Sequence, residues 1–483
     1  MIARYLIVSL YIALIVYVAL RGFRSTCSFK DFFLGGGSIG PWMTAFTYGA
    51  AYFSAVLFIG FAGKIGWEFG LSGLWIAAGN TLVGVLGVWW LLGWRIKKMS
   101  LDSGAVTMGE FLEKRYQSPG LKLFSSITVF VFFIPYSAAV FIGLAYLFRS
   151  NFNLEYWHAI VFMGVFTAFY LAMGGYRSMA LLDVIFSLIM ISGVSFLLYS
   201  ILKQGGGFHG ISEKLTAINP ELASLVGPPG WWALFCLVFL TSVAPFGMPQ
   251  LLQKFYAIRD RRSIRIGMII STLLAALISA VAYFMGASIR VFLNPENAPA
   301  AFSGGKAVFD ALVPELFIKV IPASLSVLFL LLILSASMST LAALVLLSSS
   351  TAVKDIYAGF INRKASDRLL TLLMRLTSMV FVLLSVILAW LRPATIVSIL
   401  AISWGAIGSV FLGPFLWGIL SDRVEKKGAL ASSSLGLLTC LLLYFNGSPP
   451  PEAGTIGMAV SLIVCPLVSL LAGGKSRGKS IES

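Results

Sequence analysis

Apolar runs of about 20 residues dominate the chain, and short charged or Pro- and Gly-containing breaks separate them. A run of that length can cross a hydrocarbon layer of about 30 Å as an α-helix. We predict about thirteen such helices, at residues 3–20, 41–62, 72–94, 121–148, 156–175, 178–202, 230–253, 266–292, 319–351, 371–391, 394–420, 429–446 and 454–473. The longest polar stretches, around 203–229 and 293–318, are too short for a soluble domain, so function is expected to lie in the membrane.

Composition agrees with this interpretation. Of the 483 residues, 59% are hydrophobic and 11% are charged, whereas ordinary soluble domains carry about 25% charged residues. A transmembrane β-barrel would show short strands of alternating polarity in place of continuous apolar runs. The predicted fold class is therefore an all-α polytopic membrane protein.

The formal net charge of +16 would suggest a nucleic-acid partner in a soluble chain. If the N-terminus lies outside, however, about 26 of the 35 Lys and Arg residues fall in alternate loops on one side of the membrane. Such an excess is typical of cytoplasmic loops. We therefore expect a lipid bilayer as partner, no nucleic acid, and a multi-pass protein of the cell inner membrane with a cytoplasmic C-terminus.

Two predicted spans carry helix-interrupting residues at mid-depth. The first contains Gly49 to Ser54, and the second contains Pro245 to Pro249, with breaks expected at Gly49, Gly247 and Pro249. Five helices separate the starts of these spans, a pattern typical of inverted repeats in secondary transporters. The predicted core is 41–420, with repeats 41–202 and 230–420, between a first helix and loop (1–40) and two peripheral helices with a short tail (421–483). The alternative is a pair of ordinary kinks, because Gly and Pro are common in membrane helices.

The predicted span 319–351 contains a polar face. Ala336, Ser339 and Thr340 stand at positions i, i+3 and i+4, hence on one side of the helix. Hydroxyls that face carbonyls of an unwound helix suit a hard cation such as sodium. Alternatively, these side chains bond to carbonyls of their own helix or to a neighbouring helix.

Asp183 is the acidic residue most clearly inside a predicted span. A carboxylate there is costly and usually marks an ion or proton path. Its alternative roles are a partner for Arg177 or a helix cap. An enzyme is not expected, because H-E-x-x-H is absent and the two histidines have no partner cluster.

Several spaced motifs in a fixed order resemble the solute:sodium symporter family, which has a LeuT-type inverted-repeat core. They are Gly35-Gly36-Gly37 and Gly40-Pro41-Trp42 leading into Thr47-Tyr48-Gly49-Ala50 and Ser54, Gly174-Gly175 before Asp183, Phe246-Gly247-Met248-Pro249-Gln250 with Lys254, Met338-Ser339-Thr340 followed by Lys354-Asp355-Ile356-Tyr357, and Ser403-Trp404-Gly405 through Gly413-Pro414. The resemblance covers nearly the whole chain and looks nearest to proline and pantothenate transporters.

The resemblance implies Na⁺ as the co-transported ion and a site built from five residues: carbonyls of Ala50 and Phe53, and oxygens of Ala336, Ser339 and Thr340. It also implies that Asp183 contacts the ion's ligands without binding the ion itself, or that it lies on the ion's exit path on the cytoplasmic side.

Three departures from the family pattern change these expectations. Tyr52 replaces an aspartate found in proline transporters, so proline-type ion coupling does not follow. Ala342 and Ala343 replace hydroxyls that form a second sodium site in some members, so one sodium per cycle is predicted. Leu181-Leu182 and Phe186 replace other common residues around Asp183 and weaken its assignment to the exit path.

The predicted function is sodium-coupled uptake of a small organic solute by alternating access, the solute being an amino acid or carboxylate such as proline or pantothenate. The solute site is expected between the two interrupted spans, lined by Ser54, Val56, Asn80, Tyr136, Phe246, Gln250 and Ser403. A proton-coupled transporter of the same fold that uses Asp183 is the main alternative. A sugar carrier or a solute sensor is a further one.

Overall fold

The computed structural model describes residues 2–25, 33–35, 39–152, 154–322 and 325–472. Apart from one short hairpin, β1 (Phe302–Ser303) and β2 (Lys306–Ala307), the elements in these ranges are helical. Within them, 10 helices are long and apolar enough to cross a membrane, and Leu6–Gly22 and Tyr156–Leu171 are shorter apolar helices. The predicted all-α polytopic class is confirmed.

The N-terminal half contains α1 (Ile2–Ser25), α3 (Pro41–Tyr52), η2 (Val56–Phe61), α4 (Ala62–Phe69), η3 (Gly70–Gly73), α5 (Leu74–Gly79), η4 (Asn80–Gly87), α6 (Val88–Ser103), α7 (Met108–Tyr116), α8 (Pro119–Phe152), α9 (Tyr156–Gly205), α10 (Gly207–Ile218) and η5 (Pro220–Ala223). The C-terminal half contains α11 (Trp231–Val243), η6 (Ala244–Gly247), α12 (Pro249–Ala257), α13 (Arg261–Phe292), η7 (Pro299–Ala301), α14 (Phe309–Val320), α15 (Ser326–Ser350), η8 (Thr351–Ile361), α16 (Asp367–Leu391), α17 (Ile396–Leu420), α18 (Lys426–Phe445) and α19 (Pro450–Leu471).

The first interrupted helix breaks later than the sequence predicts. Backbone at Phe53 is extended (φ −111°, ψ 129°), and helix resumes after Ser54. The freed amides find side chains: the Ser54 hydroxyl accepts from the N–H of Val56 at 3.1 Å, and the Ser337 hydroxyl accepts from the N–H of Ala55 at 3.2 Å. Non-helical backbone is tolerated at membrane depth where such partners exist.

Gly49 therefore does not mark the break, which corrects the prediction. It lies inside α3, where an added Cβ would stand 2.4 Å from Cδ2 of Leu274. The glycine is there because α13 packs closely against this face of α3.

The second interrupted helix breaks around Met248. The segment passes from α11 through η6 to an extended Met248 (φ −88°, ψ 108°), and α12 then starts at Pro249. Gly247 precedes the break, and its missing side chain leaves room for the backbone of Leu412, 2.9 Å from where a Cβ would be. Proline at the first position of α12 has no N–H to leave unpaired.

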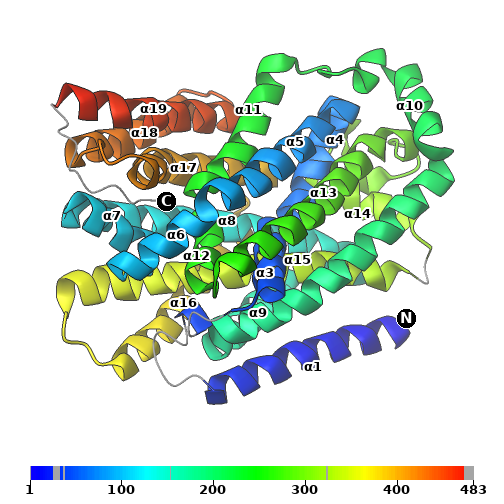
Figure 1. Cartoon of the computed structure of the whole chain (residues 1–483). Coiled ribbons are helices and arrows are strands. Elements are labelled where there is room, and N and C mark those ends of the chain that lie inside the picture. The colour runs from blue at the N-terminus through cyan, green and yellow to red at the C-terminus, as the bar shows by residue number, and fades with distance from the viewer. Residues whose placement is uncertain (1, 26–32, 36–38, 153, 323–324, 473–483) are drawn as a thin grey trace.

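The helices around these breaks differ in how deeply they are buried. α15 and α17 are almost fully enclosed, whereas α1, α16, α18 and α19 present apolar side chains outward. Figure 1 shows α18 and α19 beside α17 at one flank, with α7 and α10 at opposite ends of the bundle. α9 contains a kink at Gly175 (φ 63°), a left-handed conformation that favours glycine. The breaks therefore lie in the interior, next to α15 and α17.

Asp310 in α14, outside the membrane-spanning helices, makes stability depend on pH. Its Oδ2 accepts from the N–H of Ile396 at 3.4 Å, and burial raises the pKa of its carboxyl to about 6 although that N–H and the positive charges of Lys64 and Arg392 oppose the rise. The folded state thus holds the proton more tightly than the unfolded chain. Stability is lost as pH rises from about 4 to about 6.

We expect Asp310→Asn to raise the melting temperature of the purified protein at pH 7.5, with a gain on the order of 2 kcal/mol, because the amide removes a buried charge. The advantage over wild type should shrink as the buffer is taken to pH 4.5. Thermal unfolding of both proteins between pH 4.5 and pH 7.5 measures this advantage. An equal difference in melting temperature at pH 4.5 and pH 7.5 would contradict the proposed role of Asp310.

Candidate functional site: an ion site and a solute cavity

The hydroxyl of Thr340 lies at the break of the first interrupted helix. Its Oγ1 is 3.2 Å from the carbonyl oxygen of Ala336, 3.3 Å from that of Ala51 and 3.5 Å from that of Phe53. The structure thus brings together Phe53, Ala336 and Thr340. It adds the carbonyl of Ala51, next to the predicted Ala50, which the sequence did not indicate. Four oxygens gather where α3 ends against α15.

The neighbouring hydroxyls of α15 differ in what they bind. Ser335 bonds to Tyr11 of α1 at 3.1 Å, and Ser337 donates to the carbonyl of Ile333 at 2.7 Å. Ser339 is fully buried, and its Oγ has no hydrogen-bond partner among the described residues. A buried hydroxyl without a partner is costly. Ser339 thus differs from Ser335 and Ser337, because the described polar neighbour with which it interacts is the carboxylate of Asp183.

Asp183 of α9 lies beside Ser339. The side chain is fully buried, its carboxylate interacts with Ser339, Thr47 and Lys254, and neither oxygen has a hydrogen-bond partner in the described part of the chain. No ion pair within 4.0 Å joins it to Arg177 there, so that alternative is not supported. The polar face of α15 formed by Ala336, Ser339 and Thr340 thus continues toward a buried carboxyl group.

A small cavity lies on the other side of the break. It measures about 30 Å³, far less than the roughly 300–1,000 Å³ of typical ligand pockets. Of the predicted solute residues, four line it: Ser54, Val56, Asn80 and Tyr136. The remaining lining residues are Tyr52, Phe53, Leu57, Phe61, Thr241, Tyr283, Leu400 and Trp404. Its walls must therefore move to admit an organic solute.

Three predicted solute residues do not line this cavity. Ser403 donates to the carbonyl of Ile399 at 2.9 Å, within its own helix. Phe246 packs over Gly87, and Gln250 is buried with neither amide atom hydrogen-bonded to a described residue. Four of the seven predicted solute residues therefore line the cavity, and three do not.

Of the aromatic side chains that line the cavity, Tyr136 is predicted from the sequence, whereas Tyr52 and Trp404 are not. The Tyr52 hydroxyl donates to the carbonyl of Thr241 at 2.8 Å, and its ring meets that of Trp404 edge-on at 6.2 Å. Tyr136 packs against the same indole at 6.0 Å. The Nε1 of Trp404 is buried, and it interacts with the hydroxyl of Tyr136 without forming a hydrogen bond of good geometry to a described residue. In the sequence, Tyr52 stands within the predicted interruption, and this position is the signal that could have placed it at the cavity.

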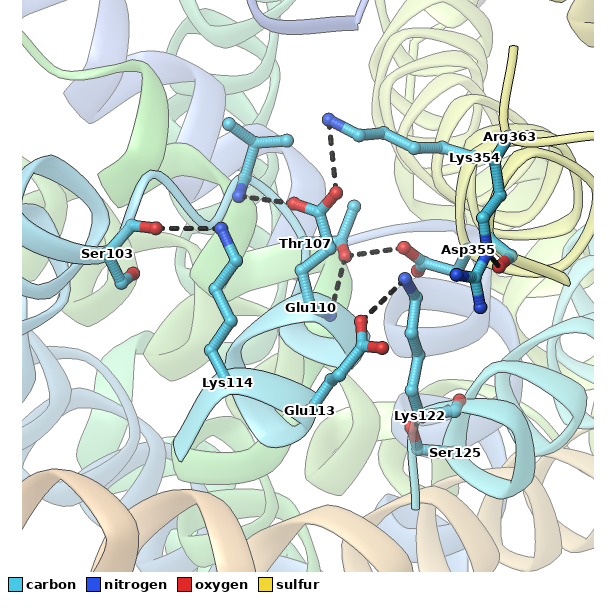
Figure 2. A network of polar contacts seen from close by, with 12 residues as sticks. Ser103, Thr107, Glu110, Glu113, Lys114, Lys122, Ser125, Lys354, Asp355 and Arg363 are labelled. Carbon is cyan, nitrogen blue, oxygen red and sulfur yellow. Dashed lines mark hydrogen bonds and ion pairs between the residues drawn. The ribbon is translucent and has the colours of Figure 1, made fainter. Parts of the chain in front are cut away.

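A polar network ties α7 to its neighbours at one end of the bundle (Figure 2). The contacts that join different elements are Thr107 Oγ1 to Asp355 Oδ1 at 2.8 Å, Lys354 Nζ to Glu110 Oε1 at 3.3 Å, and Lys122 Nζ to Glu113 Oε2 at 2.8 Å. Arg115 also donates to the carbonyls of Gly418 and Ser421 at 3.0 and 2.8 Å. α7 thereby joins the ends of α8, η8 and α17, and holds this end together.

Backbone and hydroxyl oxygens at a broken membrane helix, next to a buried cavity, are features of an ion-coupled secondary transporter. Residues 32–436 match the model of the Sodium:solute symporter family, and the chain belongs to this family. The resemblance inferred from the motifs is confirmed. The protein is a sodium-coupled symporter of a small solute, with Na⁺ as the co-transported ion.

Similar proteins cover almost the full chain. The osmoregulated proline transporter OpuE of Bacillus subtilis is 27% identical over 455 residues, which is 91% of this chain and 88% of OpuE. The sodium/pantothenate symporter of Escherichia coli is 29% identical over 437 residues, 88% of this chain and 86% of the symporter. A Na⁺-coupled sialic acid symporter, solved substrate-bound and outward-open, superposes with a TM-score of 0.82 at 19% identity, covering 97% of each chain. The last comparison shows the shared fold.

Proposed function

We propose that this protein imports an amino acid or small carboxylate, such as proline or pantothenate, with one sodium ion per cycle. The indole N–H of Trp404, a residue of the cavity wall, carries the proposal: this buried donor interacts with the Tyr136 hydroxyl, and a carboxylate would be the stronger acceptor. The other walls are mainly apolar and aromatic. That lining suits a compact solute better than a sugar, which needs many polar partners. Relatives named as proline and pantothenate transporters support the same class.

The proposed sodium site consists of carbonyls at Ala50 or Ala51 and Phe53, the carbonyl of Ala336, and the hydroxyls of Ser339 and Thr340. The oxygens around Thr340 and the unpartnered Ser339 support it. Ala342 and Ala343, on the next turn, bring no side-chain oxygen, which favours a single ion. At 100 mV one sodium supplies ~2.3 kcal/mol before its concentration gradient is added, enough for roughly fifty-fold accumulation.

In this proposal residues 41–202 and 230–420 are the two repeats that move around the site. Residues 1–40 and 421–483 flank them, the latter with α18 and α19 against α17. The N-terminus lies outside and the C-terminus in the cytoplasm, because the basic loops then face inward. The end of the bundle tied by α7 is then the cytoplasmic end. No catalytic step is required.

A proton-coupled symporter is the second candidate, favoured by the unpartnered carboxylate of Asp183. There Asp183 would carry the proton and the hydroxyls of α15 would be unnecessary. Solute uptake driven by a pH gradient in sodium-free buffer would favour this candidate.

The test is thermal stabilisation of the detergent-purified protein by amino acids, carboxylates, vitamins and sugars, each in sodium or in potassium. A ligand that binds the folded state raises its apparent stability by mass action. We expect a shift with an amino acid or carboxylate that needs sodium. A shift with sugars only, or one that is equal in potassium, would contradict the proposal.

A further inference from the structure

Lys254 of α12 is a second buried charge in the region of Asp183. Its side chain is fully buried, and its Nζ has no hydrogen-bond partner among the residues that the structure describes. The ammonium lies 5.2 Å from the centre of the Tyr176 ring, which gives it a weak cation–π contact. Buried lysines are normally paired, so the arrangement calls for an explanation.

The missing partner of Lys254 is close by. Its ammonium and the Asp183 carboxylate interact electrostatically, yet no N···O contact within 4.0 Å joins the two fully described side chains. The hydroxyls of Ser339 and Thr47 also interact with the carboxylate, but two buried opposite charges without a direct contact are costly to keep apart. Either a movement of the lysine or a third charged species is needed to satisfy the carboxylate.

One oxygen of the proposed sodium site, the Ser339 hydroxyl, lies next to Asp183. Ser339 interacts with the carboxylate and also belongs to the polar face of α15. The polar groups that interact with the carboxylate come from four elements: Thr47 on α3, Tyr170 and Tyr176 on α9, Lys254 on α12 and Ser339 on α15. Among these, the lysine supplies the one fixed positive charge.

We propose that Lys254 is a tethered cation that competes with sodium for Asp183. When sodium is bound, the carboxylate faces the ion and the lysine rests over Tyr176. As sodium leaves, the ammonium swings onto the carboxylate and takes the ion's place, which speeds release and keeps the empty carrier electrically balanced. This inference rests on the proposed sodium site and assigns Lys254 as a positioning residue, because it acts through Asp183.

The test is direct binding of ²²Na⁺ to purified protein, which needs no knowledge of the solute. If the lysine competes with the ion, Lys254→Met should bind sodium at least tenfold more tightly than wild type and release it correspondingly more slowly on dilution into unlabelled NaCl. Lys254→Arg keeps the charge and should stay near wild type. Lys214→Met, a lysine in α10 at the opposite end from α7, controls for the substitution itself.

A lysine with a merely structural role would not give this result, because its loss would leave the sodium affinity unchanged or lower it. The methionine variant should also lose its effect when Asp183→Asn is present, because the shared partner is gone. Binding is repeated at pH 9, since a proton could otherwise replace the lost ammonium on Asp183. Lys254→Gln serves the same purpose if the methionine variant does not fold.

The outcomes separate the two proposals. Tighter and slower sodium binding that depends on Asp183 supports the tethered cation. Unchanged or weaker binding in Lys254→Met, with normal binding in wild type, overturns it and leaves the sodium site standing. Absence of ²²Na⁺ binding in wild type overturns both.

Discussion

The double variant Ser339→Ala/Thr340→Ala should lose sodium-dependent solute uptake almost completely, with sodium affinity reduced at least 100-fold. Thr340 lies within 3.5 Å of three carbonyl oxygens, and Ser339 is the unpartnered hydroxyl beside it. Two of about five ligands would vanish, and each charge-assisted contact contributes about 1.5–3 kcal/mol. Binding of ²²Na⁺ and uptake into proteoliposomes under an inward sodium gradient measure both effects.

The same helix offers a matched control. Ser349 and Ser350 are an adjacent pair of buried hydroxyls that donate to the carbonyls of Leu346 and Leu347 at 3.1 and 2.9 Å, inside their own helix. Ser349→Ala/Ser350→Ala removes two hydroxyls from α15 but should leave sodium affinity close to wild type. If the variant at 339 and 340 binds sodium as wild type does, the ion site lies elsewhere, and proton coupling through Asp183 becomes the better proposal.

The sequence locates the interrupted helices more accurately than it locates their breaks. Gly and Pro predict weak points, and around Met248 the break does fall between Gly247 and Pro249. In α3, however, the extended residue is Phe53, and the glycine four positions earlier serves close packing. The break there depends on the hydroxyls of Ser54 and Ser337, which satisfy the freed amides. One of these comes from a distant part of the chain, so no local pattern contains it.

The residues that line the solute cavity are also only partly predictable from the sequence. Asn80 and Tyr136 are unusual enough within apolar spans to be predicted, and both line it. Ser403 and Trp404 are neighbours in α17, yet the serine bonds within its own helix while the indole lines the cavity. One residue turns a helix by about 100°. Because α17 is enclosed on nearly all sides, hydrophobicity cannot indicate which face meets the solute.

Trp404→Phe should weaken binding of a carboxylate solute about 10- to 100-fold while leaving sodium binding in the absence of solute unchanged. Phenylalanine keeps an aromatic surface against Tyr52 and Tyr136 but has no N–H. A hydrogen bond to a charged group contributes about 1.5–3 kcal/mol, which corresponds to this loss. The measurement is a titration of the thermal shift, in sodium, with the solute that stabilises wild type.

Trp390→Phe is the matched control, because that indole is largely exposed on the outer face of α16, and solute affinity should not change. A second comparison isolates the hydrogen bond. Wild type should bind the carboxylate solute more tightly than its uncharged methyl ester, and Trp404→Phe should reduce that preference, because the donor that distinguishes an anion is gone. If the variant weakens both compounds equally, Trp404 contributes only its shape, and the carboxylate must be recognised by a different group, such as the side-chain amide of Asn80 in the cavity wall.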